Sequence, residues 1–203
     1  MKKLRVGILG SGQGSNFLAL AKAMQNGELP IEIGWVGSDR AEAKILEHAK
    51  SMGLSTGACR TGKFKTKLEP EIEEELAQKL AEAGTELVVL AGYMRVVKEP
   101  LLARFRGKMI NLHPSLLPAF PGLKAWEQAL NAGVKETGCT VHWVNEVVDG
   151  GSVIRQVRVP VKAGDTTEIL HARIQEAEHR LLPEVVRDLA EGRIPWLKDP
   201  RKN

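Results

Sequence analysis

The sequence LRVGILGSGQGSN, residues 4–16, decides the fold class of this chain. Its first six residues form a β-like run, and glycines at positions 10, 12 and 14 separate this run from a helical pattern. Glycines let the backbone approach a ligand, and the free N–H groups at the start of a helix attract an anion. The stretch therefore predicts a strand, a phosphate-binding loop and a helix.

The spacing of these glycines sets the loop apart from other phosphate loops. It differs from the dinucleotide-binding pattern GxGxxG, and no Walker lysine follows it. The alternative is a plain strand-to-helix turn in which Ser15 or Asn16 only caps the helix.

Short β-branched runs alternate with helical patterns through the first half of the chain. This alternation predicts right-handed crossovers, a parallel sheet with helices on both faces, and a ligand site at the carboxyl ends of the strands. The expected strands cover residues 5–9, 31–37 and 87–90, and the expected helices cover residues 16–25, 41–52 and 69–83.

The second half of the chain predicts antiparallel strands and a late helical region. Two β-rich runs, 140–147 and 153–161, flank Asp149-Gly150-Gly151, whose glycines favour the positive φ of a tight reversal. From Thr167 the pattern is helical, and Pro183 is expected to start a second helical segment. The predicted class is α/β: a Rossmann-like, mostly parallel twisted sheet, with helices on both faces and antiparallel strands added in the C-terminal half.

Length and charge limit the domain organisation and the partners. At 203 residues and 43% hydrophobic content, the chain is long enough for one well-buried core. We expect a single domain over residues 1–203, with a phosphate-binding half at about 1–100 and a second half at about 101–203. The formal net charge of +4 is modest and its basic residues are scattered, which suits small anionic ligands rather than nucleic acid.

Further features predict a cytoplasmic protein without a metal. The run at residues 4–9 is too short for a signal peptide or a membrane span, so no membrane partner is expected. Cys59 and Cys139 have no CxxC spacing and no nearby histidine pair, so both are expected to be reduced and to bind no metal. We expect a monomer or a weak homodimer.

A second motif, NLHPSLLP at residues 111–118, follows a short apolar run. On a strand, Asn111 and His113 point the same way because side chains at i and i+2 share a face. Pro114 and Pro118 fix the backbone of the loop that follows. The motif is therefore a candidate catalytic site, and the alternative is a proline-rich turn with a capped histidine.

This motif, together with Phe120-Pro121-Gly122, resembles the signature of the folate-dependent formyltransferases. Gly-x-Gly-Ser-Asn at residues 12–16 is similar to the loop with which the glycinamide ribonucleotide branch of that family holds its substrate phosphate. The resemblance covers about residues 5–195 and implies formyl transfer from 10-formyltetrahydrofolate, the cosubstrate, to the amine of glycinamide ribonucleotide, with no metal. It also implies that the half at about residues 1–100 is nucleotide-phosphate-binding and that the half at about 101–203 is folate-binding and catalytic. The alternatives are a formyltetrahydrofolate deformylase or a catalytically inactive nucleotide-binding module on the same fold.

The resemblance also implies roles for individual residues. Asp149 alone would more often be a turn former, apolar residues near 94–97 are ordinarily core, and a Gln/Glu pair three apart is usually a solvated helix face. In two places the chain departs from the family pattern: residues 64–67 offer only lysines for the folate tail, and Lys124-Ala125-Trp126 replaces a histidine-containing turn. The implied residues are catalytic Asn111, His113 and Asp149; nucleotide-binding Gly14, Ser15, Asn16, Gln175 and Glu178; and folate-binding Tyr93, Met94, Arg95, Val96, Val97, Asn145, Glu146, Val147 and Val148.

The implied chemistry passes through a tetrahedral intermediate that carries an oxyanion. The amide of Asn111 is expected to donate a hydrogen bond to this oxyanion. His113, if protonated, is a second donor. Asp149 is expected to raise the pKa of His113 and to relay protons between the two nitrogens.

Overall fold

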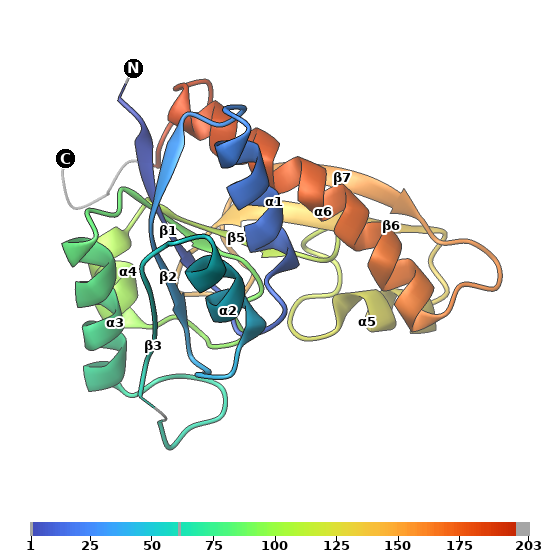
Figure 1. Cartoon of the computed structure of the whole chain (residues 1–203). Coiled ribbons are helices and arrows are strands. Elements are labelled where there is room, and N and C mark those ends of the chain that lie inside the picture. The colour runs from blue at the N-terminus through green and yellow to red at the C-terminus, as the bar shows by residue number, and fades with distance from the viewer. Residues whose placement is uncertain (1, 61, 198–203) are drawn as a thin grey trace.

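β1 (Leu4–Leu9) is an interior strand because its side chains are apolar on both faces: Val6, Ile8 and Leu9 are fully buried. Strands with two buried faces are typical of parallel sheets that helices cover on both sides. The computed structural model describes residues 2–60 and 62–197 and has this arrangement (Figure 1). The other strands are β2 (Ile31–Ser38), β3 (Thr56–Ala58), β4 (Leu87–Leu90), β5 (Met109–His113), β6 (Glu136–Trp143) and β7 (Val153–Pro160).

The sheet has the strand order β3-β2-β1-β4-β5-β6-β7. The first five strands in this order run parallel to one another, whereas β6 is antiparallel to both β5 and β7. The predicted fold class is therefore confirmed. The short strand β3 was not expected, because three residues show too little alternation to be recognised.

Helices cover both faces of the sheet, and each face has its own apolar core (Figure 1). The helices are α1 (Ser15–Gln25), α2 (Lys44–Ser51), α3 (Pro70–Glu82), α4 (Glu99–Phe105), α5 (Ala125–Asn131) and α6 (Thr167–Ala190). Buried residues of α1, α2 and α6 form the core on one face, and those of α3 and α4 form the core on the other. Within residues 2–60 and 62–197, no helix is both long and apolar enough to span a membrane.

Pro183 lies inside α6, so the expected start of a second helical segment there was wrong. Proline has no N–H, and the helical bond to the carbonyl of His179 is therefore absent. Pro183 is itself buried, beside the core residues Leu182, Val185 and Val186. This packing along one apolar face keeps the helix continuous across the lost hydrogen bond.

The loop between β6 and β7 also differs from expectation. β6 ends at Trp143, so the strand expected over residues 140–147 was placed too far along the chain. The residue with positive φ is Asp149, at 54°, and not either of the two glycines after it. Gly151 is needed for a different reason: a Cβ there would lie 1.7 Å from the carbonyl oxygen of Trp143.

The strand order reverses between β1 and β4, and ligands of open α/β sheets bind outside the carboxyl ends of the strands at such a point. Leu9, Leu90 and Asn111 are aligned across β1, β4 and β5. The glycine loop follows Leu9, and residues 91–97 follow Leu90. The register therefore brings the glycine loop, residues 91–97 and the NLHPSLLP motif together at the carboxyl ends of the parallel strands.

Candidate active site

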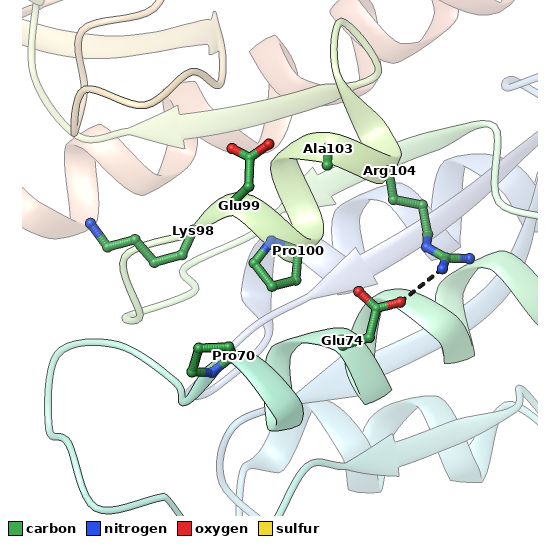
Figure 2. A pocket seen from close by; sticks show the side chains of 7 residues that line it. All are labelled: Pro70, Glu74, Lys98, Glu99, Pro100, Ala103 and Arg104. Atoms are coloured by element: carbon green, nitrogen blue, oxygen red, sulfur yellow. Dashed lines mark hydrogen bonds and ion pairs between the residues drawn. The ribbon is translucent and has the colours of Figure 1, made fainter.

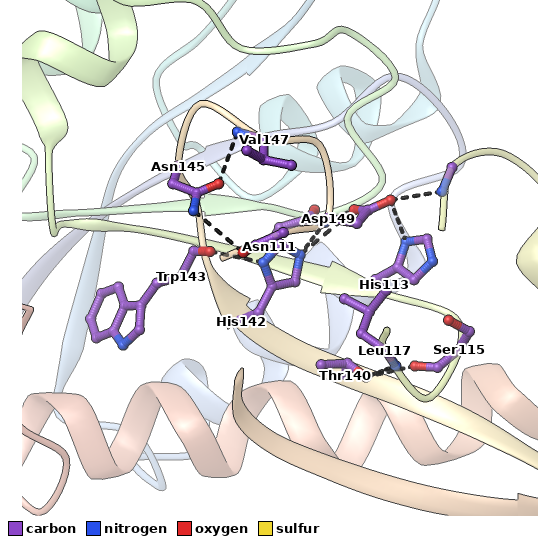
Figure 3. A network of polar contacts seen from close by, with 12 residues as sticks. Asn111, His113, Ser115, Leu117, Thr140, His142, Trp143, Asn145, Val147 and Asp149 are labelled. Carbon is purple, nitrogen blue, oxygen red and sulfur yellow. Dashed lines mark hydrogen bonds and ion pairs between the residues drawn. The ribbon is translucent and has the colours of Figure 1, made fainter. Parts of the chain in front are cut away.

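Asp149 lies in the loop after β6, where its side chain is 8% exposed. One carboxylate oxygen, Oδ2, accepts a hydrogen bond from the backbone N–H of Gly122 at 2.8 Å and lies 3.4 Å from Nδ1 of His113. The other oxygen, Oδ1, lies 3.4 Å from Nδ2 of Asn111 (Figure 3). The structure thus brings together the three residues expected to be catalytic.

His113 is buried at the end of β5 with acceptors on both ring nitrogens. Nε2 lies 2.9 Å from the carbonyl oxygen of Phe120, so this nitrogen carries a hydrogen and donates it. Nδ1 faces Asp149. Phe120 itself has a φ of 55°, an uncommon conformation for a residue with a side chain.

His142 is a member of the site that sequence reasoning missed. It is paired with Asn111 across β5 and β6, and the two side chains meet at 3.1 Å between Nε2 and Nδ2. Nδ1 of His142 lies 2.8 Å from the carbonyl oxygen of Trp143 and donates to it, so Nε2 accepts from the Asn111 amide. The sequence could have indicated His142 only through a prediction that β6 pairs with β5 in the register that places His142 opposite Asn111.

Two opposing influences set the protonation of the site. Burial favours a higher pKa for Asp149, but the hydrogen bond from the Gly122 N–H and the charge of a protonated His113 outweigh it and lower the pKa below 3.8. Burial lowers the pKa of His113 below 6.5, against the opposing effects of the Phe120 carbonyl and Asp149. The expectation of a raised pKa for His113 was therefore wrong, because lost solvation exceeds the attraction of the carboxylate.

Side chains of the sheet hold the loop that follows β5. The hydroxyl of Thr140 donates to the carbonyl oxygen of Ser115 at 2.6 Å and accepts from the N–H of Leu117 at 3.1 Å. Gln156 donates to the carbonyl oxygen of Leu117 at 2.8 Å. The Leu117–Pro118 peptide bond is cis. These bonds fix the path of the loop that carries Phe120 and Gly122 to the site.

The glycine loop ends at Gly14, which has a φ of 78° and precedes α1 without a side-chain cap. The alternative in which Ser15 or Asn16 caps the helix is therefore excluded. The first N–H groups of an α-helix have no partners within the helix, and here they face the end of the loop. A Cβ on Gly10 would lie 2.9 Å from the carbonyl oxygen of Ala91, so this glycine permits the close approach of two loops.

Asn16 joins α1 to α6. Its Nδ2 donates to Oε2 of Glu178 at 2.9 Å, and Glu178 is 5% exposed. Burial raises the pKa of Glu178, and the hydrogen bond from Asn16 opposes the rise. Among the described residues, Oδ1 of Asn16 is a buried atom without a hydrogen-bond partner. Gln175, one turn earlier, is half-buried. Of the Gln/Glu pair that could have formed a solvated helix face, only Gln175 is therefore partly exposed to solvent.

The residues of the two expected folate segments lie in mixed environments. Tyr93 and Val97 are buried in the core between the sheet and α3, whereas Met94 is 56% exposed. Arg95 is ion-paired and the N–H of Val96 donates to the carbonyl oxygen of Thr66 at 2.8 Å. On the other loop, the exposed residues are Asn145, Glu146, Val147 and Val148.

The residues at the two departures from the family pattern make contacts within the chain. The ammonium of Lys67 lies 4.7 Å from the ring centroid of Phe64, and residues 67 and 96 form a short parallel bridge. Trp126 stacks on His171 of α6 with ring centroids 3.8 Å apart, which attaches α5 to α6.

Other features of the described residues lie outside this cluster. Within residues 2–60 and 62–197, no group of three or more His, Cys, Asp or Glu side chains is arranged to hold a metal ion. A groove between the first turns of α3 and α4 contains none of the predicted site residues (Figure 2). It is lined by Pro70, Glu74, Lys98, Glu99, Pro100, Ala103 and Arg104.

Comparisons with known proteins agree with this geometry. The family model described as formyl transferase matches residues 4–186. The chain is 39% identical over 199 residues to the phosphoribosylglycinamide formyltransferase of Haemophilus influenzae, a match that covers 98% of this chain and 92% of that protein. The crystal structure of glycinamide ribonucleotide transformylase 1 from Symbiobacterium toebii superposes with a TM-score of 0.90 at 43% identity, covering 98% of this chain and 92% of that one.

A longer relative matches over part of its length. The trifunctional purine biosynthetic protein adenosine-3 of Bos taurus is 41% identical over 193 residues, which are 95% of this chain. The chain spans 19% of that protein. The similarity therefore reaches only one portion of the trifunctional protein.

Replacing Asp149 by Asn removes the charge beside His113 and retains the shape of the side chain. Because Asp149 opposes the effect of burial, we expect the pKa of His113 to fall further in Asp149→Asn. Titration of the His113 ring signals by NMR, with the half-buried His48 of α2 as an internal control, measures the shift. An unchanged His113 midpoint would show that Asp149 is not its charge partner.

Proposed function

Because this chain belongs to the formyl transferase family, we propose that it transfers the formyl group of 10-formyltetrahydrofolate to the amine of glycinamide ribonucleotide. The products are formylglycinamide ribonucleotide and tetrahydrofolate, a step of purine biosynthesis. The amine nitrogen bonds to the formyl carbon, the bond from that carbon to N10 breaks, and one proton passes from the amine to N10. The relatives that match over nearly their whole length support this reaction.

The observation that carries the proposal is the convergence of Asn111, His113 and Asp149 beside the glycine loop and residues 91–97. An acyl-transfer site needs donors for an oxyanion, a group that moves protons, and pockets on both sides of the reacting carbon. The strand register supports this assignment, because it aligns the ends of β1, β4 and β5, from which these segments continue.

Asn111 is the first donor to the oxyanion. One of its amide hydrogens is held by His142 at 3.1 Å, and the other points towards Asp149 over 3.4 Å, which is long for a hydrogen bond. The second hydrogen is therefore weakly held and available to the substrate oxygen. His142 acts on the reaction through Asn111, whose amide plane it orients.

His113 is the second donor. Its Nε2–H is bonded to the carbonyl oxygen of Phe120, so the formyl oxygen must displace this carbonyl when the substrate binds. A negative oxygen is a stronger acceptor than a peptide carbonyl, which favours the exchange as the tetrahedral intermediate forms. Asp149 stabilises the imidazolium that this step favours and passes protons between the two nitrogens through water.

Two pockets follow from the same arrangement. Gly14, Ser15 and Asn16 hold the phosphate of the nucleotide through the helix start, with Gln175 and Glu178 on its sugar side. Residues 93–97 and Asn145–Val148 flank the pterin of the folate. The exposed Met94, Val147 and Val148 support this assignment because they offer an apolar surface to an aromatic ring.

The cellular setting is part of the proposal. A reaction between two small anionic substrates fits a modest, scattered positive charge. We place the protein in the cytoplasm as a monomer or weak homodimer that engages neither nucleic acid nor membranes.

The acceptor of the formyl group tests the proposed reaction. Incubated with 10-formyltetrahydrofolate labelled with ¹³C in the formyl group, the protein should produce labelled formylglycinamide ribonucleotide only when glycinamide ribonucleotide is present. Asn111→Ala should lower kcat by about 10²–10³, the effect of removing one oxyanion donor. The exposed, remote variant Asn26→Ala is the matched control. Labelled formate without the nucleotide indicates a deformylase, and no labelled product indicates an inactive binding module.

The glycine loop offers a separate test of the phosphate pocket. A Cβ on Gly14 would lie 2.9 Å from Cα of Ile45 and would strain the fold, whereas a Cβ on the exposed Gly12 would meet no atom within 4 Å. Gly12→Val should therefore fold normally and fill space beside the helix start. By calorimetry, we expect affinity for glycinamide ribonucleotide to fall at least tenfold and affinity for tetrahydrofolate to stay within twofold. Equal losses of both affinities would contradict a dedicated phosphate loop.

A further inference from the structure

A second buried carboxylate, that of Asp39, lies directly after β2 and takes no part in the chemistry described above. Its side chain is 3% exposed, and both of its oxygens are engaged. Oδ1 accepts from the hydroxyl of Ser11 at 2.5 Å, and Oδ2 accepts from Nε of Arg95 at 2.6 Å. Ser11 belongs to the glycine loop and Arg95 to the folate segment, so one carboxylate joins both.

The direction of the hydrogen bonds around Ser11 is fixed by chemistry. The backbone N–H of Met94 lies 2.8 Å from the hydroxyl oxygen of Ser11 and must donate to it. The hydroxyl hydrogen is therefore directed to Asp39, which as a carboxylate only accepts. The N–H of Ser11 also donates to the carbonyl oxygen of Gly92 at 3.0 Å. Ser11 is thus bonded to the folate segment at two points and to Asp39 at a third.

Arg95 extends the same connection to a third segment. Its NH1 donates to the carbonyl oxygen of Phe64 at 2.6 Å, while its Nε remains on Asp39. The side chain of Arg95 is 17% exposed. The loop that contains Phe64 therefore depends on the same ion pair for its position beside residues 94–97.

We propose that Asp39 is a positioning residue that couples the binding of the two substrates, by holding the phosphate loop and the folate segment through Ser11 and Arg95. The inference rests on the proposed function, because that function assigns the nucleotide to one segment and the folate to the other. Asp39 touches neither the reacting atoms nor either substrate in this account.

The coupling follows from the cost of ordering loops. A ligand that fixes one of two connected loops lowers the entropy cost of fixing the other, so the second ligand binds more tightly. The effect is reciprocal: each substrate raises the affinity for the other by the same factor. Loops without a shared carboxylate would each bear this cost alone.

A buried ion pair elsewhere in the chain serves as a matched control. Asp165 binds Arg173 through two hydrogen bonds of 2.6 and 2.7 Å, and its side chain is 5% exposed. This pair lies at the start of α6, away from both loops. Asp165→Asn therefore removes a similar ion pair without touching the connection between the pockets.

The test measures the affinity for glycinamide ribonucleotide by calorimetry, with and without saturating tetrahydrofolate. In the parent protein and in Asp165→Asn, we expect tetrahydrofolate to raise that affinity by roughly fivefold or more, the lower end of measured allosteric couplings. In Asp39→Asn the factor should fall to about one, and Ser11→Ala, which removes only a hydroxyl, should lower it in the same direction. A lost factor in Asp39→Asn, with the parental factor kept in Asp165→Asn at matched thermal stability, supports the proposal.

Three results would overturn it: no coupling in the parent protein, a parental factor in both Asp39→Asn and Ser11→Ala, or an equal loss in Asp165→Asn. Failure of the proposed function has a different appearance, because the parent protein would then fail to bind glycinamide ribonucleotide, tetrahydrofolate or both. In that case hydrogen exchange of the backbone amides still tests the hydrogen bond between Ser11 and Met94. The Met94 N–H should exchange at least tenfold faster in Ser11→Ala, and unchanged exchange would refute the bond on which the inference depends.

Discussion

The rest of the candidate site depends on the contacts that the carboxylate of Asp149 makes. Its two oxygens are approached by N–H groups from the end of β5 and from the loop at Gly122. These segments lie 27 or more residues away in sequence. The residue adopts a φ of 54°, a conformation that is uncommon for side chains other than Asn and Asp. The close backbone passage at Gly151 permits this turn. Backbone geometry and charge are therefore coupled at a single residue.

The negative charge of Asp149 explains why two buried histidines, His113 and His142, lie side by side around its carboxylate. The buried His113 and His142 are each held by a backbone carbonyl through one nitrogen, and the other nitrogen faces the carboxylate or the Asn111 amide. Because the pKa of Asp149 is lowered, its contribution to stability is present above pH 4 and is lost as the pH falls through the lowered value. The same charge that organises the site thus also favours the folded state at neutral pH.

Much of the fold could be predicted because local patterns and packing agree. β1, β4 and α1 appear within one residue of their expected bounds, and the alternation of strands and helices correctly indicates a parallel sheet. The prediction failed where tertiary packing overrides a local signal. Pro183 is retained inside α6 by the burial of its ring, and the reversal at Asp149 does not use its glycines.

The candidate site was predictable to the extent that its residues lie on one strand or in one loop. Asn111 and His113 are two residues apart on β5, and a period of two places them on one face. His142 and Asp39 could not be found in this way, because their roles depend on the pairing of β6 with β5 and on the position of β2 next to β1. The hydrogen bond from Asn16 to Glu178 likewise depends on the packing of α1 against α6, helices that are far apart in sequence.

The ionisation of Asp149 tests the central claim most directly. Titration of its side-chain carboxyl carbon by ¹³C NMR in the unmodified protein gives the midpoint without a substitution. The account predicts a midpoint below 3.8, because the donors around the carboxylate outweigh its burial. A midpoint above 3.8 would contradict it, since burial would then dominate and the carboxylate would not be the stable charge that positions Asn111 and His113.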